Sequence, residues 1–400
     1  MPSWRQNSTN ENRICSSEQA TTDRQRRNFL TSSVTIAMTT AFRPQPVHAA
    51  FNSKKNVNNN SIPPAIVEPQ SITVPLKFIG GAYLVYYRVE SNLFRAVLDT
   101  GSPFLMIPGS CSANTRAKTG CYREQGVPSG LETTFEIFDG FEGEVEWRKA
   151  PFSFVNATGS MIVSSPSVVF GVADDGILSG PGGVFFGLIK NTEKRIRPSF
   201  LGQTDITSFV IDLRRANDNL FAAGPSPIAS TDAIDVEIAA ASSPSLTLST
   251  VPLLTSVDFI PMTNDLRKNY GDPVQHYVAK AKAIVIDGIP LIPTNRKPIY
   301  VIFDTGVTGM VVSKELFDQR YREARERREK RLWGGPVEVS FETDQKNTKT
   351  ITAQKPLTTP FDPKKNWSGF NRHVIVIGLS FLDSKKLTVD IDDGRLWIDG

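Results

Sequence analysis

The sequence predicts an all-β protein that is built from two homologous halves. Its 400 residues include 27 prolines and 28 glycines without a fixed period, which indicates many turns between short strands. An internal repeat is the second observation, because the motif Asp-Thr-Gly follows an apolar run at Asp99 and again at Asp304. A chain of this length also exceeds what one compact core usually needs, so we expect two core-forming units.

The first half opens with segments that are typical of β-strands. Residues 74–89 contain two runs of β-branched and aromatic residues on either side of Gly80 and Gly81, which predicts a hairpin. Residues 93–98 predict a further apolar strand. This strand leads directly into Asp99, so the first Asp-Thr-Gly motif is expected at the end of a buried strand.

The second half repeats this order. Residues 276–286 predict a strand before the Asp-Gly pair at 287–288, which favours a two-residue hairpin turn, and residues 300–303 predict the strand before the second motif. One helix is predicted over residues 314–331, because acidic residues there precede basic residues by four positions. Its many charges are expected to form a solvated face.

A later mark completes the repeat. Each half carries two apolar residues followed by Gly and an aliphatic residue, at 185–188 and at 376–379. Two homologous β-lobes would show such an ordered set of marks. We therefore divide the chain into a presequence at 1–50, a linker at 51–70, an N-terminal lobe at 71–215 and a C-terminal lobe at 216–400.

The first fifty residues resemble an export signal. Arg26 and Arg27 precede a mildly apolar run over residues 31–42, and small residues follow at Ala49 and Ala50, as at a signal-peptidase site. The polar stretch before the arginines favours a plastid presequence that directs the protein to the thylakoid lumen, although its three acids argue against a transit peptide. The alternatives are a periplasmic or secreted protein, or a short amphipathic helix of the folded domain.

The charge of the chain argues against a nucleic-acid partner. The formal net charge is +4, and residues 1–50 carry six arginines against three acids, so the remainder has a net charge of only +1. No uninterrupted apolar run reaches the roughly 18 residues that a membrane-spanning helix needs. We expect no integral membrane segment and no nucleic-acid binding.

The cysteine and histidine content restricts redox and metal chemistry. Cys15 would leave with the presequence, so that Cys111 and Cys121 remain on one loop. In a non-cytosolic compartment two such thiols favour a local disulfide, and two free buried thiols are the alternative. Only His276 and His373 remain after processing, far apart in sequence, so we expect neither a metal site nor a cofactor.

The two Asp-Thr-Gly motifs are the candidate site. A single copy after an apolar run indicates no more than a strand-ending turn, but two copies at matching places in a repeat indicate chemistry. Two buried carboxyls that lie a few ångströms apart cannot both ionise, so they share a proton. One then acts as general base on a water, and the other acts as general acid to a carbonyl oxygen. This arrangement suits amide hydrolysis at acidic pH.

The residues around both motifs resemble the pepsin-type (two-lobed eukaryotic) aspartic endopeptidases over roughly residues 71–400. The resemblance implies an all-β bilobal fold of two β-barrel-like lobes, with an active-site cleft between them that binds an extended peptide. It implies that segments 186–187 and 377–378 close the two catalytic loops, and that Cys111 and Cys121 form a short disulfide loop. The residues that it assigns to the site are Asp99 and Asp304 as the catalytic pair, with Thr100, Gly101, Ser102, Thr305, Gly306 and Thr308 in support.

The sequence also departs from that family. Val307 stands where the family has Ser or Thr, although Thr308 follows it, whereas Ser102 is expected to hydrogen-bond Asp99. The family's flap carries a Tyr, and in the corresponding stretch over residues 135–147 either Phe138 or Phe141 stands in its place. The Trp147 indole is a candidate substitute donor. The alternative for this stretch is a surface hairpin whose aromatic residues cover an edge.

These observations leave three functional hypotheses. The first is a monomeric aspartic endopeptidase that uses Asp99 and Asp304, with an activity that Val307 and the absent flap Tyr could weaken. The second is a weak or inactive homologue that binds proteins or peptides through the same cleft. The third is a structural β-protein of the lumen, which the retention of both carboxyls disfavours.

Overall fold

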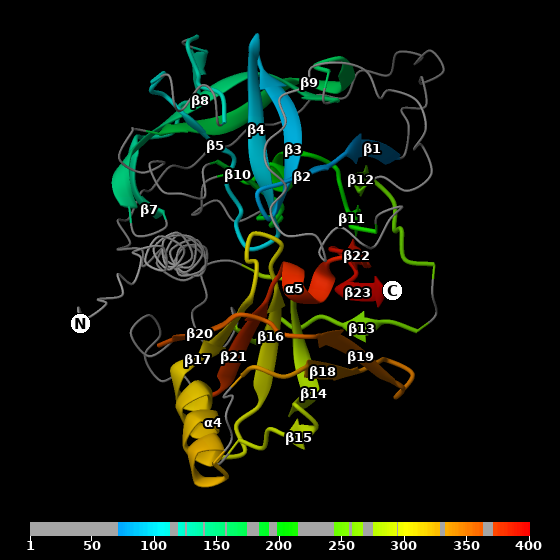
Figure 1. The fold of residues 1–400 in the computed structure, drawn as a ribbon. Helices are drawn as coiled ribbons and strands as arrows, with labels where there is room; N and C mark the ends of the chain where they lie inside the picture. Colours follow the sequence, from blue (N-terminus) through cyan, green and yellow to red (C-terminus); the bar gives the residue numbers. More distant parts are fainter. Residues whose placement is uncertain are drawn as a thin grey trace, which may run out of the picture.

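The computed structural model describes residues 71–400 with several gaps, and the predictions for residues 1–70 lie outside the described part. The gaps are 113–118, 125, 139–140, 157, 174–183, 192–197, 215–243, 256–257, 267–274, 294, 329–332 and 363–370. The described residues are mostly β-strand, as the sequence predicted. Their strands form three sheets (Figure 1).

The first sheet contains the strands around the first Asp-Thr-Gly motif. Its strands are β2 (Lys77–Ile79), β3 (Ala82–Val89), β4 (Asn92–Asp99), β5 (Met106–Pro108), β6 (Val127–Pro128), β7 (Thr134–Phe138), β8 (Phe141–Val155), β9 (Met161–Ala173) and β10 (Phe185–Gly187). The main path of hydrogen-bonded neighbours runs β10-β4-β3-β8-β9-β5. β4 is the strand that ends at Asp99, the first residue of the motif. β4 pairs antiparallel with β3 and parallel with β10, so its inner residues are buried on both faces.

The second sheet contains the strands around the second motif. Its strands are β14 (Val278–Ile286), β15 (Ile289–Pro290), β16 (Ile299–Phe303), β17 (Met310–Ser313), β18 (Val337–Glu342), β19 (Thr348–Ala353), β20 (Thr358–Phe361) and β21 (His373–Ile377). Helices α4 (Lys314–Glu326) and α5 (Leu379–Leu382) follow β17 and β21. β16 pairs antiparallel with β14 and parallel with β21, which repeats the pairing of β4.

The third sheet joins segments that are far apart in the sequence. It has the order β1-β12-β11-β22-β23-β13 within the described residues. The strands are β1 (Ser71–Pro75), β11 (Ser208–Asp212), β12 (Ser245–Ser249), β13 (Ile260–Pro261), β22 (Lys386–Asp390) and β23 (Arg395–Asp399), and the short 3₁₀ helix η2 (Leu201–Gln203) precedes β11. Figure 1 shows β22 and β23 between the first sheet above and the second sheet below.

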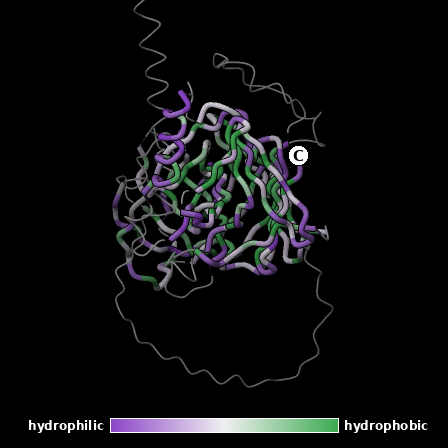
Figure 2. The backbone as a smooth tube through the Cα atoms, turned by 90° about the horizontal axis from the view of Figure 1, so that it is seen from below, coloured by the Kyte–Doolittle hydropathy of each residue, from purple (hydrophilic) through white to green (hydrophobic). Residues whose placement is uncertain are grey.

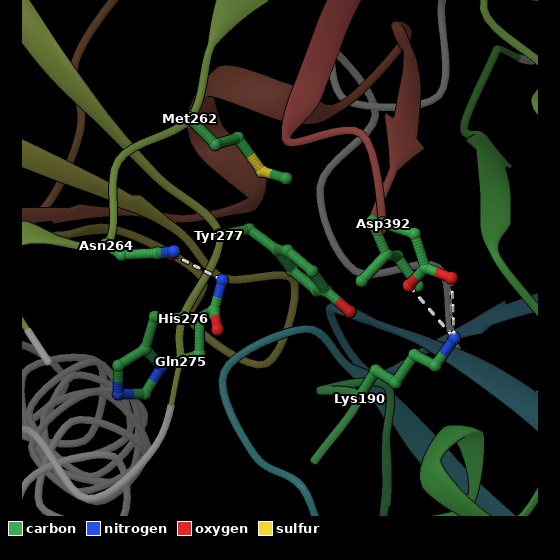
Figure 3. Close-up of a pocket in the computed structure, with 8 residues that line it drawn as sticks. Lys190, Met262, Asn264, Gln275, His276, Tyr277 and Asp392 are labelled. Carbon is green, nitrogen blue, oxygen red and sulfur yellow. Dashed lines mark hydrogen bonds and ion pairs between the residues drawn. The ribbon is translucent and has the colours of Figure 1, made fainter. Parts of the chain in front are cut away.

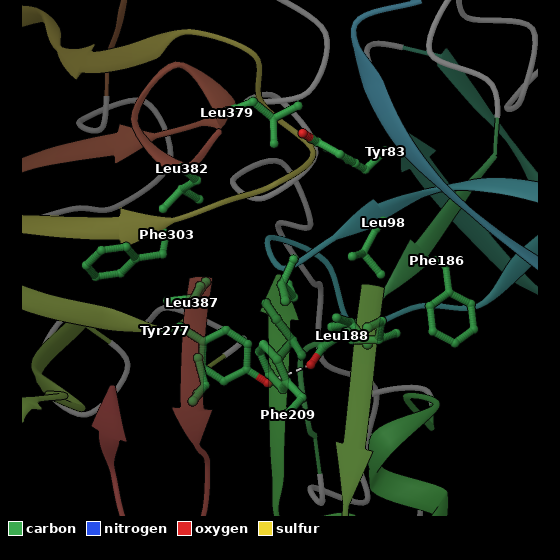
Figure 4. Close-up of a cluster of buried hydrophobic side chains, with 14 of the residues drawn as sticks. Tyr83, Leu98, Phe186, Leu188, Phe209, Tyr277, Phe303, Leu379, Leu382 and Leu387 are labelled. Atoms are coloured by element: carbon green, nitrogen blue, oxygen red, sulfur yellow. Dashed lines mark hydrogen bonds between the residues drawn. The ribbon is translucent and has the colours of Figure 1, made fainter. Parts of the chain in front are cut away.

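One hydrophobic cluster extends through all three sheets. Leu98 of β4, Phe303 of β16 and Phe209 of β11 are fully buried members of it (Figure 4). Figure 2 likewise shows the hydrophobic stretches of the chain running through the interior. Burial of each such side chain contributes roughly 1.5–3 kcal/mol. The ends of β4 and β16 are therefore held by a common core.

The predicted hairpins are confirmed, and the predicted helix is shorter than expected. Gly80 and Gly81 both have positive φ angles, of 62° and 89°, as the turn between β2 and β3 requires. The turn at 287–288 has the same property, with φ angles of 51° and 75°. Helix α4 ends at Glu326, because Arg328 adopts a left-handed φ of 55° that an α-helix cannot continue through.

Candidate active site

The two Asp-Thr-Gly motifs lie at equivalent places in the first two sheets. Asp99 is the last residue of β4, and Asp304 directly follows β16. Each strand has a parallel neighbour that ends in a small residue or leads into one, since Gly187 pairs with Asp99 and Ile377 pairs with Phe303. The two halves thus deliver their carboxyls from matching strand ends.

The threonines of the motifs bond the two halves to each other. The Thr100 hydroxyl donates to the Phe303 carbonyl at 2.8 Å and accepts the Thr305 N–H at 3.0 Å. The Thr305 hydroxyl donates to the Leu98 carbonyl at 2.7 Å and accepts the Thr100 N–H at 3.2 Å. All four groups are buried, so each bond satisfies a polar group that would otherwise be costly. This reciprocal lock fixes the two loops against each other.

The glycines bring the two carboxyls face to face. The Gly101 N–H donates to Asp99 Oδ1 at 2.7 Å, and the Gly306 N–H donates to Asp304 Oδ1 at 2.8 Å. A Cβ atom on Gly101 would collide with the Asp304 carboxyl, and one on Gly306 would lie 2.7 Å from Asp99 Oδ1. Each glycine therefore packs against the carboxyl of the opposite half, and any side chain there would displace it.

The two carboxyls form a coupled pair. Asp99 and Asp304 are 4% and 2% exposed. Burial raises the pKa of both, and the neighbouring Asp99 charge raises the pKa of Asp304 further, to well above its ordinary value. For Asp99 the interaction with Asp304 opposes the effect of burial, but the pKa of Asp99 also stays above its ordinary value. Two buried carboxyls with raised pKa values share one proton, which belongs to the pair.

The surroundings of the two carboxyls differ. The buried Ser102 hydroxyl lies beside Asp99 and lowers its pKa, although it makes no hydrogen bond of regular geometry within the described residues. The matching position is occupied by Val307, which is fully buried and packs in an apolar cluster. Only backbone N–H groups lower the pKa of Asp304. Thr308 is partly exposed, and its carbonyl accepts the Ser380 N–H at 2.9 Å.

The segments that were expected to close the loops lie against them. The N–H of Leu188, which follows Gly187, donates to the Asp99 carbonyl at 2.8 Å, and a Cβ on Gly187 would lie 2.6 Å from the Ser102 carbonyl oxygen. In the second half the Gly378 N–H donates to a carbonyl of the loop, that of Gly309, at 2.9 Å. Both glycines are needed because the backbones approach too closely for a side chain.

The hairpin of β7 and β8 carries the predicted flap candidates. The side chains of Phe138 and Phe141 lie outside the described part of the structure. The Trp147 indole N–H donates to the Thr134 hydroxyl at 3.0 Å, and that hydroxyl donates to the buried Glu136 carboxylate at 2.6 Å. Trp147 is thus hydrogen-bonded inside the hairpin.

His276 and Tyr277 are two residues that sequence reasoning did not connect with the site. His276 is 3% exposed, and its charge lowers the pKa of Asp99. The buried Tyr277 hydroxyl donates to the Leu188 carbonyl at 2.6 Å, and burial raises its pKa. Both residues directly precede β14, and β14 pairs with β16, the strand that leads into Asp304. This position was the sequence feature that could have connected them with the site.

The cysteines form the predicted disulfide. Cys111 and Cys121 are bonded, with their Cα atoms 5.2 Å apart. The disulfide follows β5, so it links two points of the segment that comes after the first Asp-Thr-Gly loop. In the second half helix α4 follows the corresponding strand, β17.

The described residues contain no group of three or more His, Cys, Asp or Glu side chains that could hold a metal ion. No helix in the same part of the chain is long and apolar enough to cross a membrane. No protein-family model matches the chain, and no curated protein matches it.

Proposed function

We propose that the protein is an aspartic endopeptidase of the pepsin type. The observation that carries the proposal is the buried pair of Asp99 and Asp304, locked together by reciprocal threonine hydrogen bonds. In this proposal the first and second sheets are the cores of two homologous lobes, and the third sheet joins them. The lobe boundaries near residue 215 and the export to a non-cytosolic compartment belong to the same proposal.

We assign the general-acid role to Asp304, whose pKa is raised further, and the general-base role to Asp99. The Asp99 carboxylate takes a proton from a water, whose oxygen attacks the carbonyl carbon of the peptide. Asp304 gives its proton to the carbonyl oxygen, so that a neutral tetrahedral diol forms. Asp99 then returns its proton to the leaving nitrogen while the C–N bond breaks, and Asp304 recovers a proton from a diol hydroxyl. Every proton is accounted for without a covalent intermediate.

The test is cleavage of a denatured protein by three variants. Asp99→Asn and Asp304→Asn each remove one proton-transfer group, and we expect each to lower cleavage at least a hundredfold at pH 3–6, since general acid–base groups contribute about 10²–10⁴-fold. Asp318→Asn is the control, because this half-exposed residue of α4 pairs with the nearby Lys314 and lies outside the two motifs. Full cleavage by Asp99→Asn would refute the mechanism.

A second candidate is a peptide-binding homologue with weak or no activity. Val307 favours it, because a buried valine supplies no hydroxyl to Asp304. The two candidates differ in turnover: a binder would retain peptides equally well as wild type and as Asp304→Asn, and would release no cleaved product. Measurable wild-type cleavage that Asp304→Asn abolishes would remove this candidate.

A further inference from the structure

A cavity of about 210 Å³ is lined in part by Tyr277, which is hydrogen-bonded to the segments next to both Asp-Thr-Gly motifs (Figure 3). It opens where the segment after β10, the start of β14 and the turn between β22 and β23 meet. The lining residues that matter here are Lys190, Asn264, Gln275, His276, Tyr277 and Asp392. Most of this lining is polar, whereas the core behind it is apolar.

Tyr277 connects the cavity to both catalytic loops. Its hydroxyl donates to the Leu188 carbonyl at 2.6 Å, and the Leu188 N–H donates to the Asp99 carbonyl at 2.8 Å. Its own carbonyl accepts the N–H of Phe303, the residue before Asp304, at 3.1 Å. A group that enters the cavity therefore lies next to the backbone of both loops.

His276 forms the part of the lining next to Tyr277 in the sequence, and its side chain is buried. The neighbouring amides of Asn264 and Gln275 hydrogen-bond each other through Gln275 Nε2 and Asn264 Oδ1. Because the Asn264 oxygen accepts this bond, its amide nitrogen is a donor at the same edge of the cavity. This side of the cavity thus presents N–H donors.

An ion pair forms the opposite side. Lys190 Nζ donates to the Ile206 carbonyl at 2.8 Å and to Asp392 Oδ1 at 3.0 Å. The side chain of Lys190 is 13% exposed, whereas that of Asp392 is 51% exposed, so the lysine is the inner partner. Solvent screens the Asp392 end of this ion pair, because about half of that side chain is exposed. A carboxylate that enters the cavity can therefore replace Asp392, while Ile206 keeps the ammonium group in place.

We propose that this cavity is a substrate subsite that binds an acidic side chain, Asp or Glu, of the peptide near the bond that is cleaved. Lys190 supplies positive charge to the carboxylate, His276 and the neighbouring amides supply N–H donors, and the volume admits one side chain. The proposal rests on the proposed endopeptidase activity, because it assigns the cavity, which lies next to the backbone of the two Asp-Thr-Gly loops, to the substrate of that activity. It adds a substrate preference that the pair itself does not determine.

The experiment digests a proteome-derived peptide library and determines the cleavage sites by mass spectrometry. We expect acidic residues to exceed their amides about tenfold at one position, as for a charge-assisted hydrogen bond. Lys190→Met should reduce this ratio to below about twofold. Asp392→Asn should raise it, because the competing carboxylate is gone, and a folding defect cannot produce that gain.

The exposed pair of Lys314 and Asp318 on α4 provides matched controls. Lys314→Met and Asp318→Asn make the same chemical changes at another ion pair, and should leave the ratio as in wild type. A wild-type ratio near one at every position would overturn the proposal. So would an unchanged ratio in both Lys190→Met and Asp392→Asn.

A binding measurement separates this proposal from the proposed activity. The same library is passed over immobilised Asp304→Asn protein, and the retained peptides are sequenced. Enrichment of acidic peptides that Lys190→Met abolishes supports the subsite even where no variant cleaves, and in that case only the endopeptidase proposal fails. Cleavage without acidic enrichment in either measurement would support the endopeptidase proposal and refute the subsite proposal.

Discussion

The two Asp-Thr-Gly loops share their backbone hydrogen bonds but differ in the side chains around their carboxyls. In both, a glycine N–H donates to the aspartate and a threonine crosses to the other half. Around Asp99, however, Ser102 and His276 also favour the carboxylate, whereas around Asp304 the place of the serine is taken by Val307. A symmetric scaffold thus carries an asymmetric pair, in which the pKa of Asp304 is raised further than that of Asp99.

Different structural features follow the two loops along the chain. The first is followed by the disulfide of Cys111 and Cys121, and the second by helix α4, which packs Leu316 into the core. Neither feature touches the carboxyls. The difference in pKa therefore arises from the few side chains next to each carboxyl, and substitutions there can test it.

The largest expected effect concerns stability. The unfolded chain loses the proton of an aspartate above about pH 4, but the folded pair keeps one proton. The folded state then binds more protons than the unfolded state, so stability falls as the pH rises from about 4 through the raised pKa, by up to about 1.4 kcal/mol per pH unit. Asp304→Asn should reduce this slope, because only the raised pKa of Asp99 then contributes to it, and should raise the free energy of unfolding at pH 7.

Chemical unfolding between pH 4 and 7 measures this slope. Asp318→Asn is the control, since this half-exposed residue of α4 lies outside the pair. If Asp304→Asn unfolded with the same pH dependence as wild type, the raised pKa of Asp304 would not be the source of the slope.

The next prediction concerns the reciprocal threonine hydrogen bonds, which are the same in both halves. Thr100→Val leaves the Thr305 N–H without its acceptor, and Thr305→Val does the same to the Thr100 N–H. Each buried group costs about 1–3 kcal/mol when it loses its partner, so both variants should lose about 2 kcal/mol of stability, together with much of the activity. Thr73→Val, at an exposed threonine on β1, should lose little.

Urea unfolding of the three variants provides the comparison. A large difference between Thr100→Val and Thr305→Val would show that the lock is not reciprocal, and the halves would then differ in their backbone as well as in their side chains.

Much of this arrangement could be predicted from the sequence. The strands before Asp99 and Asp304 were predictable because each is an apolar run that ends at a polar turn, and the hairpin at 287–288 because Asp-Gly tolerates positive φ. The disulfide followed from two cysteines on one loop. The third sheet was not predicted, because β1 pairs with β12 over a long sequence separation that no local pattern encodes.

The site was predictable in its motifs and not in its surroundings. Asp-Thr-Gly is a contiguous signal, whereas His276 reaches Asp99 only through the pairing of β14 with β16. The cavity likewise joins Lys190 and Asp392, which the fold brings together although 202 positions separate them in the sequence. Electrostatic neighbours of this kind depend on tertiary contacts, which composition and periodicity do not contain.

A smaller effect should make the two loops more alike. Val307→Thr places a hydroxyl where the first loop has Ser102, and a hydroxyl that donates to the carboxylate favours the charged form of Asp304. The upper pKa of the pair should fall, so the basic limb of kcat/KM should move to lower pH by about one unit. Val311→Thr, in the same apolar cluster, is the control. A basic limb that stays in place would mean that position 307 does not set the asymmetry.

The smallest effect acts on the other member of the pair. The charge of His276 lowers the pKa of Asp99, so His276→Gln should raise that pKa and move the acidic limb of kcat/KM to higher pH, by roughly half a unit. The sign follows because Asp99 must be ionised to act as base, and without His276 it is protonated at a higher pH. His373→Gln, at a buried histidine that contacts Ser313, is the matched control. Opposite shifts of the two limbs, basic for Val307→Thr and acidic for His276→Gln, would narrow the active pH range from both sides. An acidic limb that moved to lower pH would instead assign the lower pKa to a group other than Asp99.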